Sequence, residues 1–449
     1  MIKLKSKYIC QQCGAEFSKW SGKCDNCGAW NSLLEQTTET SGKSAVSRSR
    51  GKKLKTASLK NIKTELVGKR IKTSFSDLDD VLGGGLMLGG ICLMAGQPGI
   101  GKSTLLLQIA AYVANQKSVL YISGEESEGQ IKLRAERLGA TSDEKLELAA
   151  STSADDIATT IRAGKYQLVI VDSMQTMTLA EIASAPGTVS QITNSSNVIT
   201  RAAKETNTAV VLVGHVTKEG SIAGPKVLEH LVDVVLQFEG DRYGGFKVVR
   251  AIKNRYGATS EAAIFEMLDS GLQLVKNPSA ALLAERQNAD GSVVLATLEG
   301  SRPLLVEIQA LVNPTHFGYP KRTASGFDLN RLNLLVAVLE KRTKLKLSDK
   351  DIYVNVVGGL KLQDPAADLA VCMAIASAAA GRRLGDEVVV FGEVGLGGEI
   401  RSVHSARRRI DEAKKLGFGF AIAPGTKPKQ SFIHEVKDMR QAFIKYLEK

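Results

Sequence analysis

Short apolar runs alternate with helix-like segments between about residues 73 and 274. The runs read ICLMA, SVLYIS, LVIVD, AVVLVG, VVLQF and KVVRAI. Continuous apolar strands joined by helices are typical of βαβ units, whose parallel sheet is covered on both faces. The pattern therefore predicts an α/β fold built on a parallel sheet.

The pattern breaks near residues 276–278, and a second set of elements follows to the end of the chain. Its predicted strands read VVLATLEG, LLVEIQALV, DIYVNVV and EVVVFGEV, and its predicted helices cover residues 328–342, 365–380 and 405–416. This mixture favours an α+β domain.

A polar, basic stretch at residues 37–61 has almost no large apolar side chains and is typical of a flexible linker. The chain has 449 residues, which is enough for two or three domains. We expect a small N-terminal unit at residues 1–34, a linker at 35–65, a first large domain at 66–276 and a second at 277–449.

The composition adds a charge argument. The net charge is +12 and 43% of the residues are hydrophobic, so the chain can bury cores and favours a polyanionic partner. Nucleic acid is the first choice and an anionic membrane surface the second, while general solubility is the alternative. The longest apolar run, residues 369–381, is shorter than the ~20 residues of a membrane span, and the N-terminus lacks the apolar stretch of a signal peptide. We expect a cytoplasmic protein with reduced thiols.

Four cysteines lie close together as Cys10, Cys13, Cys24 and Cys27. Two CxxC pairs at this spacing can hold Zn²⁺ in a tetrahedral site and stabilise a segment too small for a core. A redox pair or coincidence are the alternatives. The pattern leaves open whether such a ribbon contacts DNA, contacts a partner protein or only supports the fold.

A phosphate-binding loop is predicted at GQPGIGKS, residues 96–103, between a strand and an amphipathic helix. Its amides and the helix N-terminus would cradle the phosphates of ATP, Lys102 would contact the β- and γ-phosphates, and Ser103 would hold Mg²⁺. The predicted binding residues are Gly96, Gln97, Pro98, Gly99, Ile100, Gly101, Lys102, Ser103 and Thr104.

Other polar residues follow apolar runs and are candidates for the same site. Asp172 ends LVIVD and suits the Mg²⁺-associated carboxylate, with helix capping as the alternative. Glu125 follows another run and would orient and deprotonate the attacking water, with Glu126 as second choice. His215 ends AVVLVGH and would either sense the γ-phosphate or serve structurally.

Several of these segments together resemble one family. Residues 75–104 resemble the entry to a RecA-type ATPase core; with the cysteine segment, KNRYG at 253–257 and the C-terminal region, the chain resembles the bacterial RadA (Sms) family of DNA repair proteins. The family motif usually reads KNRFG, so Tyr256 keeps an aromatic ring. The resemblance implies a RecA-like P-loop ATPase that forms hexameric rings, uses ATP, Mg²⁺ and Zn²⁺, binds single-stranded and branched DNA, and promotes branch migration of intermediates made by the RecA recombinase.

The resemblance also implies a role for Lys253 and Arg255. In RecA-type rings ATP lies between subunits, so these cations would reach the phosphates held by a neighbour and stabilise the charge that develops there. The alternative is a basic turn on the surface. DNA-contacting loops are expected near residues 175–196 and 217–230, where Lys218 and Lys226 suit backbone contacts to single strands.

The C-terminal region resembles the proteolytic domain of Lon. That family uses a serine and a lysine, and this chain has Ala366 and Val403 at the matching places. Without nucleophile or base the domain is expected to be proteolytically inactive. It would help to build the ring and offer a basic surface, or these side chains would form an ordinary solvated face: Arg382, Arg383, Arg401, Arg407, Arg408 and Arg409.

Three other functions compete with a DNA motor. A RecA-like nucleotide switch or kinase is disfavoured by the zinc ribbon, the basic linker and KNRYG. An ATP-dependent protease is disfavoured by Ala366 and Val403, and a non-hydrolysing DNA scaffold by the presence of Lys102, Asp172 and Glu125.

Overall fold

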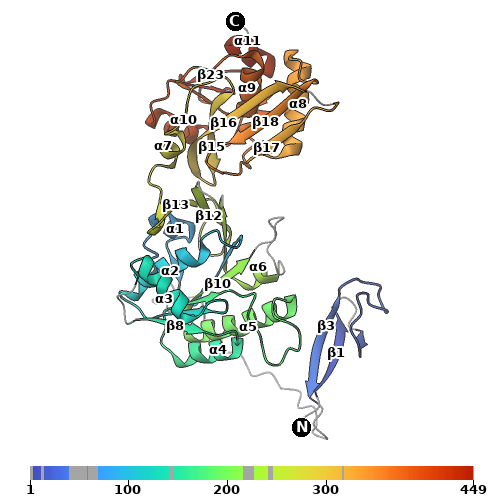
Figure 1. Cartoon of the computed structure of the whole chain (residues 1–449), viewed down its shortest axis with the longest axis vertical. Coiled ribbons are helices and arrows are strands. Elements are labelled where there is room, and N and C mark those ends of the chain that lie inside the picture. The colour runs from blue at the N-terminus through green and yellow to red at the C-terminus, as the bar shows by residue number, and fades with distance from the viewer. Residues whose placement is uncertain are drawn as a thin grey trace.

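The computed structural model describes residues 4–11, 15–39, 58, 69–140, 145–215, 227–240, 246–315 and 318–447. Figure 1 shows two larger bodies, one above the other along the long axis, and a small ribbon of strands. Cys13, Lys218, Lys226 and most of the predicted linker lie outside the described residues. Among the described helices, none has the length and apolar character that crossing a bilayer requires.

The ribbon has three antiparallel strands. β1 (Leu4–Cys10) lies between β2 (Glu16–Phe17) and β3 (Leu33–Glu39). β3 reaches Glu39, so residues 35–39, which the sequence assigned to the linker, are part of this sheet.

The first large body is built on a nine-stranded sheet. Its parallel strands are β11 (Val234–Gly240), β6 (Ile91–Gly96), β10 (Ala209–His215), β9 (Leu168–Asp172), β7 (Val119–Ser123) and β8 (Leu146–Ala150), in that spatial order. The predicted parallel sheet is therefore present. β8 (LELAA) was not among the predicted strands, because an edge strand with partly exposed residues lacks a continuous apolar run.

Helices cover both faces of this sheet, as βαβ connections require. One core contains residues of α1 (Ser76–Val81), α2 (Lys102–Ala114) and α3 (Glu128–Arg137), and the other contains residues of α4 (Ala154–Ala163), α5 (Val189–Thr206) and α6 (Val227–Leu231). Successive side chains of a strand point to opposite faces. Accordingly, Cys92 and Met94 of β6 pack in the first core, and Ile91 and Leu93 in the second.

Three antiparallel strands extend the sheet beyond β11. They are β12 (Phe246–Asn254), β13 (Ala262–Leu268) and β14 (Gly271–Leu274). The sequence placed KVVRAI in the parallel set, and the structure corrects this: β12 forms a hairpin with β11 and runs against it. An apolar run predicts a buried strand but not its direction.

The hairpin of β12 and β13 contributes to two cores at once. Val249 and Phe265 pack in the first core of the nine-stranded body, while Val248 and Ile264 pack in the core of the second large body. Figure 1 shows β12 and β13 where the two bodies meet.

The second body is built on a seven-stranded mixed sheet. In spatial order its strands are β17 (Arg322–Ser325), β18 (Lys350–Val356), β16 (Arg302–Pro314), β15 (Ser292–Glu299), β19 (Val388–Val390), β22 (Phe420–Ala423) and β23 (Ile433–Glu435). Its helices are α7 (Pro278–Leu283), α8 (Leu329–Thr343), α9 (Ala367–Ala380), α10 (Ala406–Lys415) and α11 (Met439–Leu447). The three predicted helices correspond to α8, α9 and α10.

Two pairs of short strands complete the fold. β4 (Arg70–Ile71) pairs with β5 (Leu86–Met87) ahead of the phosphate loop. The segment EVVVFGEV, predicted as one strand, is divided: β19 ends at Val390, and β20 (Glu393–Val394) pairs with β21 (Ile400–Arg401). Gly392 lies at the break, against Ile400 and Pro424, where a β-carbon would be crowded.

Candidate functional site: a phosphate loop and its polar neighbours

The strand order brings the predicted polar residues to one edge of the nine-stranded sheet. In the register of the parallel strands, His215 at the end of β10 lies opposite Gly96 at the end of β6. Ser123 at the end of β7 lies opposite Asp172 at the end of β9. Because the strands are parallel, all four carboxyl ends face the same side, where open α/β sheets bind their ligands.

The phosphate loop passes directly from β6 into α2. Gly101 takes φ +116°, a backbone conformation that strongly favours glycine, and Lys102 then begins the helix. Gly96 leaves only 2.7 Å between a hypothetical β-carbon and the carbonyl oxygen of Phe238. Amides at the start of α2 have no intrahelical partner and are free for anionic oxygens.

Lys102 is buried beneath this loop. Its Nζ donates to the carbonyl oxygens of Gly96 at 2.9 Å and Gln97 at 3.0 Å. Burial lowers the pKa of Lys102 to about 8, although the carboxylates of Asp172 and Glu125 favour its charged form. Two carbonyl oxygens of the loop thus accept hydrogen bonds from Lys102 in the position where the oxygens of a bound phosphate would accept them.

His215 connects this lysine to a carboxylate. Its Nδ1 lies 3.3 Å from Nζ of Lys102, and its Nε2 lies 3.3 Å from Oε1 of Glu125. A neutral ring that accepts at Nδ1 from the ammonium group and donates at Nε2 satisfies both contacts. Ser173 also donates to the same carboxylate oxygen. Burial raises the pKa of Glu125, but the hydrogen bonds from Ser173 and His215 outweigh it, so this pKa lies below its usual value.

The structure distinguishes the two candidate glutamates. Both of their amides are held by the hydroxyl of Ser123, at 3.2 Å for Glu125 and 2.9 Å for Glu126. Glu126 turns to Arg134 of α3 and forms an ion pair with it. The side chain that faces the phosphate loop through His215 is therefore that of Glu125.

Asp172 is buried at the end of β9, and its Oδ2 accepts a hydrogen bond of 2.7 Å from Tyr121. Burial and this carboxylate hold the pKa of Tyr121 well above its usual value, so the phenol stays a donor. Ser103 lies on the first turn of α2, the helix that begins at the phosphate loop. A hydroxyl and a carboxylate are oxygen donors of the kind Mg²⁺ prefers, so these two residues fit that ion.

Lys253 and Arg255 lie on the opposite side of the sheet from the phosphate loop, at the amino-terminal ends of the parallel strands. Nζ of Lys253 donates to the carbonyl oxygens of Glu229 at 2.5 Å and Val232 at 2.8 Å, at the end of α6. Arg255 pairs with Asp233 at 3.1 Å, and the other oxygen of Asp233 accepts from the amide of Ile91, the first residue of β6.

The separation of the two edges follows from strand geometry. β6 has six residues, and at about 3.3 Å per residue its ends are roughly 17 Å apart. The cations of KNRYG are thus brought together with Asp233, and not with Lys102 or Glu125 of the same chain.

Several residues of these networks were missed from the sequence. Ser173 and Tyr121 position Glu125 and Asp172, and Asp233 binds both Arg255 and the start of β6. Ser173 directly follows LVIVD, which is a usable signal. Tyr121 and Asp233 each lie within an apolar run of the sequence, so their hydrogen-bond partners become visible only once the pairing of the strands is known.

The first predicted DNA loop, residues 175–196, is partly helical. α5 begins at Val189, so residues 189–196 of the predicted loop belong to this helix, and Ser195 and Ser196 are buried in it. Small polar residues fit equally well in a helix that packs closely against α4. Residues 217–226 of the second predicted loop lie outside the described residues.

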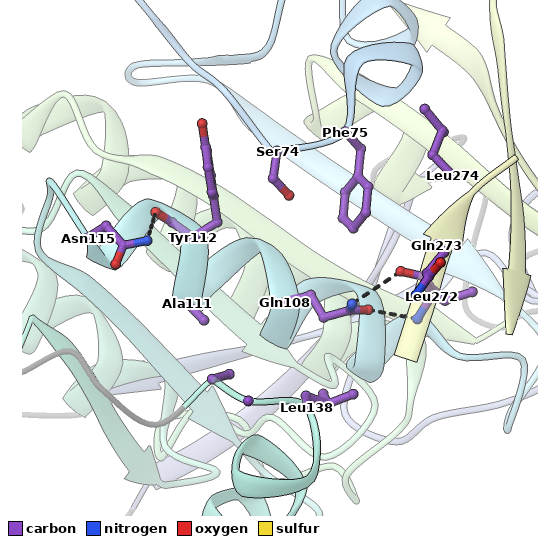
Figure 2. A pocket seen from close by; sticks show the side chains of 12 residues that line it. Ser74, Phe75, Gln108, Ala111, Tyr112, Asn115, Leu138, Leu272, Gln273 and Leu274 are labelled. Atoms are coloured by element: carbon purple, nitrogen blue, oxygen red, sulfur yellow. Dashed lines mark hydrogen bonds between the residues drawn. The ribbon is translucent and has the colours of Figure 1, made fainter. Parts of the chain in front are cut away.

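A hollow of about 490 Å³ lies along the later turns of α2, as Figure 2 shows. Its wall includes Gln108, Tyr112 and Asn115, and Asn115 lies about 20 Å along the helix from Lys102. The amide of Gln108 binds the backbone of Leu272 through its oxygen at 3.0 Å and its nitrogen at 3.1 Å. These bonds occupy main-chain groups on the edge strand β14, a protective role for an exposed sheet edge. Among the residues that line the hollow, none belongs to the phosphate loop at residues 96–104.

Three cysteines of the ribbon converge. The thiol sulfurs of Cys10, Cys24 and Cys27 lie within 4.8 Å of one another, and those of Cys10 and Cys27 are 3.6 Å apart. Two ligands of a tetrahedral zinc ion with Zn–S bonds of 2.3 Å are separated by about 3.8 Å, so the thiols fit Zn²⁺. Cys92 and Cys372 are buried elsewhere, as expected.

In the second body, Ala366 is fully buried just before α9. Arg409 lies nearby and pairs with Asp364 at 2.6 Å, and its exposed fraction is 1%. Arg409 is therefore not part of a basic surface, contrary to the prediction, because α10 turns it inward. Val403 is half-buried against the core, and the other five predicted arginines are exposed.

Three families match parts of the chain. An AAA domain matches residues 56–221, a rubredoxin metal binding domain residues 8–35, and the subunit ChlI of Mg-chelatase residues 333–427.

Full-length relatives match as well. The DNA repair protein RadA of Halalkalibacterium halodurans is 49% identical over 94% of this chain and 93% of its own length. That of Aquifex aeolicus is 48% identical over 94% of each chain, and that of Bacillus subtilis 46% identical over 98% of each. The crystal structure of the RadB recombinase matches with a TM-score of 0.37 and 22% identity, covering 46% of this chain and all of that one.

Proposed function

Because the chain belongs to the DNA repair protein RadA family, we propose that it is a DNA-dependent ATPase that drives branch migration of recombination intermediates. It would act on single-stranded and branched DNA made by a RecA recombinase, in the cytoplasm, as a ring of identical subunits. The observation that supports hydrolysis most directly is the connection from Lys102 through His215 to Glu125.

The phosphates of ATP would bind the loop of residues 96–104 and the first amides of α2. Lys102 would exchange the carbonyl oxygens of Gly96 and Gln97 for the β- and γ-phosphates. This exchange also breaks its contact with His215, so the histidine reports whether a γ-phosphate is present.

Glu125 is the group we assign to the attacking water. Its pKa lies below the usual value and the group is ionised at neutral pH, so the carboxylate can accept a hydrogen bond from water; hydrolysis would pass the proton of that water to it. Ser103 and Asp172 would hold Mg²⁺, which neutralises charge on the β- and γ-phosphates when bound.

We assign Lys253 and Arg255 to the ATP site of a neighbouring subunit. They lie a full strand length from the phosphate loop of their own chain, so contact with ATP in the same subunit would require rebuilding the sheet. We propose that the ring is a hexamer in which each subunit presents KNRYG to its neighbour. Hydrolysis of ATP would then depend on assembly of the ring. The competing assignment is structural, because Lys253 caps α6 and Arg255 pairs with Asp233.

Mixing two variants tests this assignment. Lys102→Ala removes the phosphate lysine and Lys253→Ala removes the cation offered to the neighbour, so each alone should lose DNA-stimulated turnover. In mixed rings about a quarter of the seams would combine an intact Lys102 with an intact Lys253 from the next subunit. We expect DNA-stimulated hydrolysis to reappear on mixing.

Lys253→Gln is the matched control, since its amide can still donate to the carbonyls of α6 without carrying charge. If Lys253→Gln hydrolyses ATP normally, or if mixing restores nothing, the assignment in trans fails. If DNA leaves the rate of ATP hydrolysis by the wild-type protein unchanged, the proposal of a DNA motor fails as well. A nucleotide switch without DNA translocation then describes the protein better.

We further propose that the Lon-like C-terminal body does not hydrolyse peptides. Ala366 has no nucleophile, and the basic residue near it, Arg409, is engaged with Asp364 and the carbonyl oxygen of Ala296 at 2.8 Å. Cleavage of casein by the purified protein, lost on mutation of this region, would contradict the proposal.

A further inference from the structure

The chain contains two tryptophans, and both lie exposed on the cysteine ribbon. Trp20 is 58% exposed and Trp30 is 73% exposed. Tryptophan is usually largely buried, since its ring is the largest apolar surface a side chain offers. Exposure of every tryptophan of a 449-residue chain on one small unit marks that surface for contact with a ligand.

The two rings lie beside each other. Each comes within 3.9 Å of the position that a β-carbon would take on Gly22, so both rings border this glycine. Lys23 pairs with Trp30 across an antiparallel bridge, and the amide of Asn31 donates to the carbonyl oxygen of Gly22 at 2.8 Å. The turn that holds Cys24 and Cys27 separates Trp20 from Trp30 in sequence, so formation of this metal-binding turn brings the rings together.

Cations accompany the aromatic rings. Nζ of Lys23 lies 5.7 Å from the centre of the Trp30 ring, and the exposed Lys19 directly precedes Trp20. Asp25 is the exposed acid of the same turn. Flat aromatic faces next to lysines are the combination that binds single-stranded nucleic acid, because bases stack on the rings while the ammonium groups meet phosphates.

We propose that Trp20 and Trp30 form a base-stacking site for single-stranded DNA on the ribbon, separate from the ATPase body. This inference rests on the proposed DNA-dependent function and assigns part of its DNA contact to named residues. Stacking is indifferent to base identity, since every base has a π-face, so the site would bind without sequence preference.

Intrinsic fluorescence tests the site directly in the full-length, zinc-loaded protein. Because the chain has no other tryptophan, all indole emission comes from this surface. We expect emission to fall when a fluorescein-labelled oligothymidylate of about 20 nucleotides binds, in step with the anisotropy of the label. Trp20→Phe and Trp30→Phe each leave one reporter and a stacking ring, and both should still respond.

Alanine variants measure the contribution to affinity. Trp20→Ala and Trp30→Ala should each weaken binding about tenfold, the size expected for the loss of one stacked base. Tyr319→Ala, which removes an 88% exposed aromatic ring from the second body, should bind as wild type. The zinc content of each variant shows whether the ribbon is folded.

Three outcomes overturn the inference. Anisotropy that rises while indole emission stays constant means that DNA binds elsewhere and leaves the proposed function intact. Emission that changes with RecA recombinase but not with DNA makes this a protein-docking surface. Absence of any anisotropy change removes the proposed function together with this site.

Discussion

At the scale of single residues, one buried lysine and one histidine meet at the end of the sheet where we propose that ATP binds. Lys102 is bound by carbonyl oxygens of its own loop and by His215, and burial lowers its pKa to about 8. A lysine in this state loses its proton more easily than one in water, so the charge that ATP requires depends on pH.

Affinity for MgATP should therefore fall as pH rises above about 8. Bound phosphates favour the charged lysine and raise its pKa, so above pH 8 binding must take up a proton and can weaken by up to about tenfold per pH unit. Calorimetry in two buffers of different ionisation enthalpy at pH 9 would detect the uptake. Lys102→Ala should bind weakly and show no such uptake; equal proton uptake in that variant would assign it to another group.

The two adjacent glutamates give a second prediction at this scale. Glu125→Gln should retain ATP binding and lower the rate of hydrolysis by about 10²–10⁴, because the amide cannot accept the proton of water. Glu126→Gln is the matched control and should change the rate little, since Glu126 pairs with Arg134. Single-turnover measurements with saturating ATP separate hydrolysis from binding. A larger loss in Glu126→Gln would reverse the assignment.

The positions of Lys102, Glu125 and Asp172 at one end of the sheet could be predicted residue by residue, while their roles stay predictions. GQPGIGKS identifies Lys102, and carboxylates after apolar runs identify Asp172 and Glu125, because both signals are local in sequence. The roles of Tyr121, Ser173 and Asp233 could not be predicted, since each depends on which strands are neighbours.

At the scale of elements, β12 connects the cores of the two large bodies with the KNRYG motif. Its side chains alternate between the cores of the two large bodies, and its last residues begin KNRYG. Arg250, near the middle of the strand, pairs with Glu239 of β11 and with Glu299 of β15, both at 3.0 Å. β12 thus joins the C-terminal body to the cations that we assign to the neighbouring ATP site.

Removing Arg250 should destabilise the junction in a pH-dependent way. Burial raises the pKa of Glu299, and the charges of Glu239 and Asp364 raise it further, while Arg250 lowers it. Because the net shift is upward, Glu299 binds its proton more tightly in the folded state than in the unfolded state. In Arg250→Ala this difference grows, and stability should fall as pH rises from 5 to 7, by about 3 kcal/mol at neutral pH.

Urea unfolding at pH 5 and pH 7 would measure the difference. Arg250→Ala combined with Glu299→Gln should recover part of the loss, because Glu299 is then neutral and only Glu239 has lost its ion-pair partner. A pH-independent loss, or none in the single variant, would show that the ion pair does not stabilise the junction.

The elements also show what apolar patterns cannot predict. The parallel strands and the helices α8, α9 and α10 were expected, because their side chains follow the periods of buried strands and amphipathic or buried helices. The direction of β12, the existence of β8 and the division of EVVVFGEV at Gly392 depend on pairing and packing, which a single sequence does not display.

At the scale of the whole molecule, the ribbon and the ATPase body have separate structural bases. In the part of the ribbon that the structure describes, the buried cluster consists of Cys10, Cys24 and Leu33, whereas the nine-stranded body has extensive cores on both faces. Metal binding should therefore control the first and not the second.

Removal of zinc by a chelator, or Cys24→Ser, should abolish the DNA-dependent change in indole emission and leave ATP hydrolysis without DNA unchanged. Zinc analysis together with steady-state hydrolysis would check this. If basal hydrolysis is lost with the metal, the ribbon supports the ATPase body itself.

The hairpin of β12 and β13 has a consequence for how this protein can be divided. The predicted boundary at residues 276–277 falls after both strands, yet Val248, Ala262 and Ile264 are covered by the C-terminal body. A chain ended there would expose this apolar face to water and should aggregate when expressed, even though every strand of the nine-stranded sheet is retained. The C-terminal body thus supplies the cover for one face of the β12–β13 hairpin, and the two bodies depend on each other for solubility.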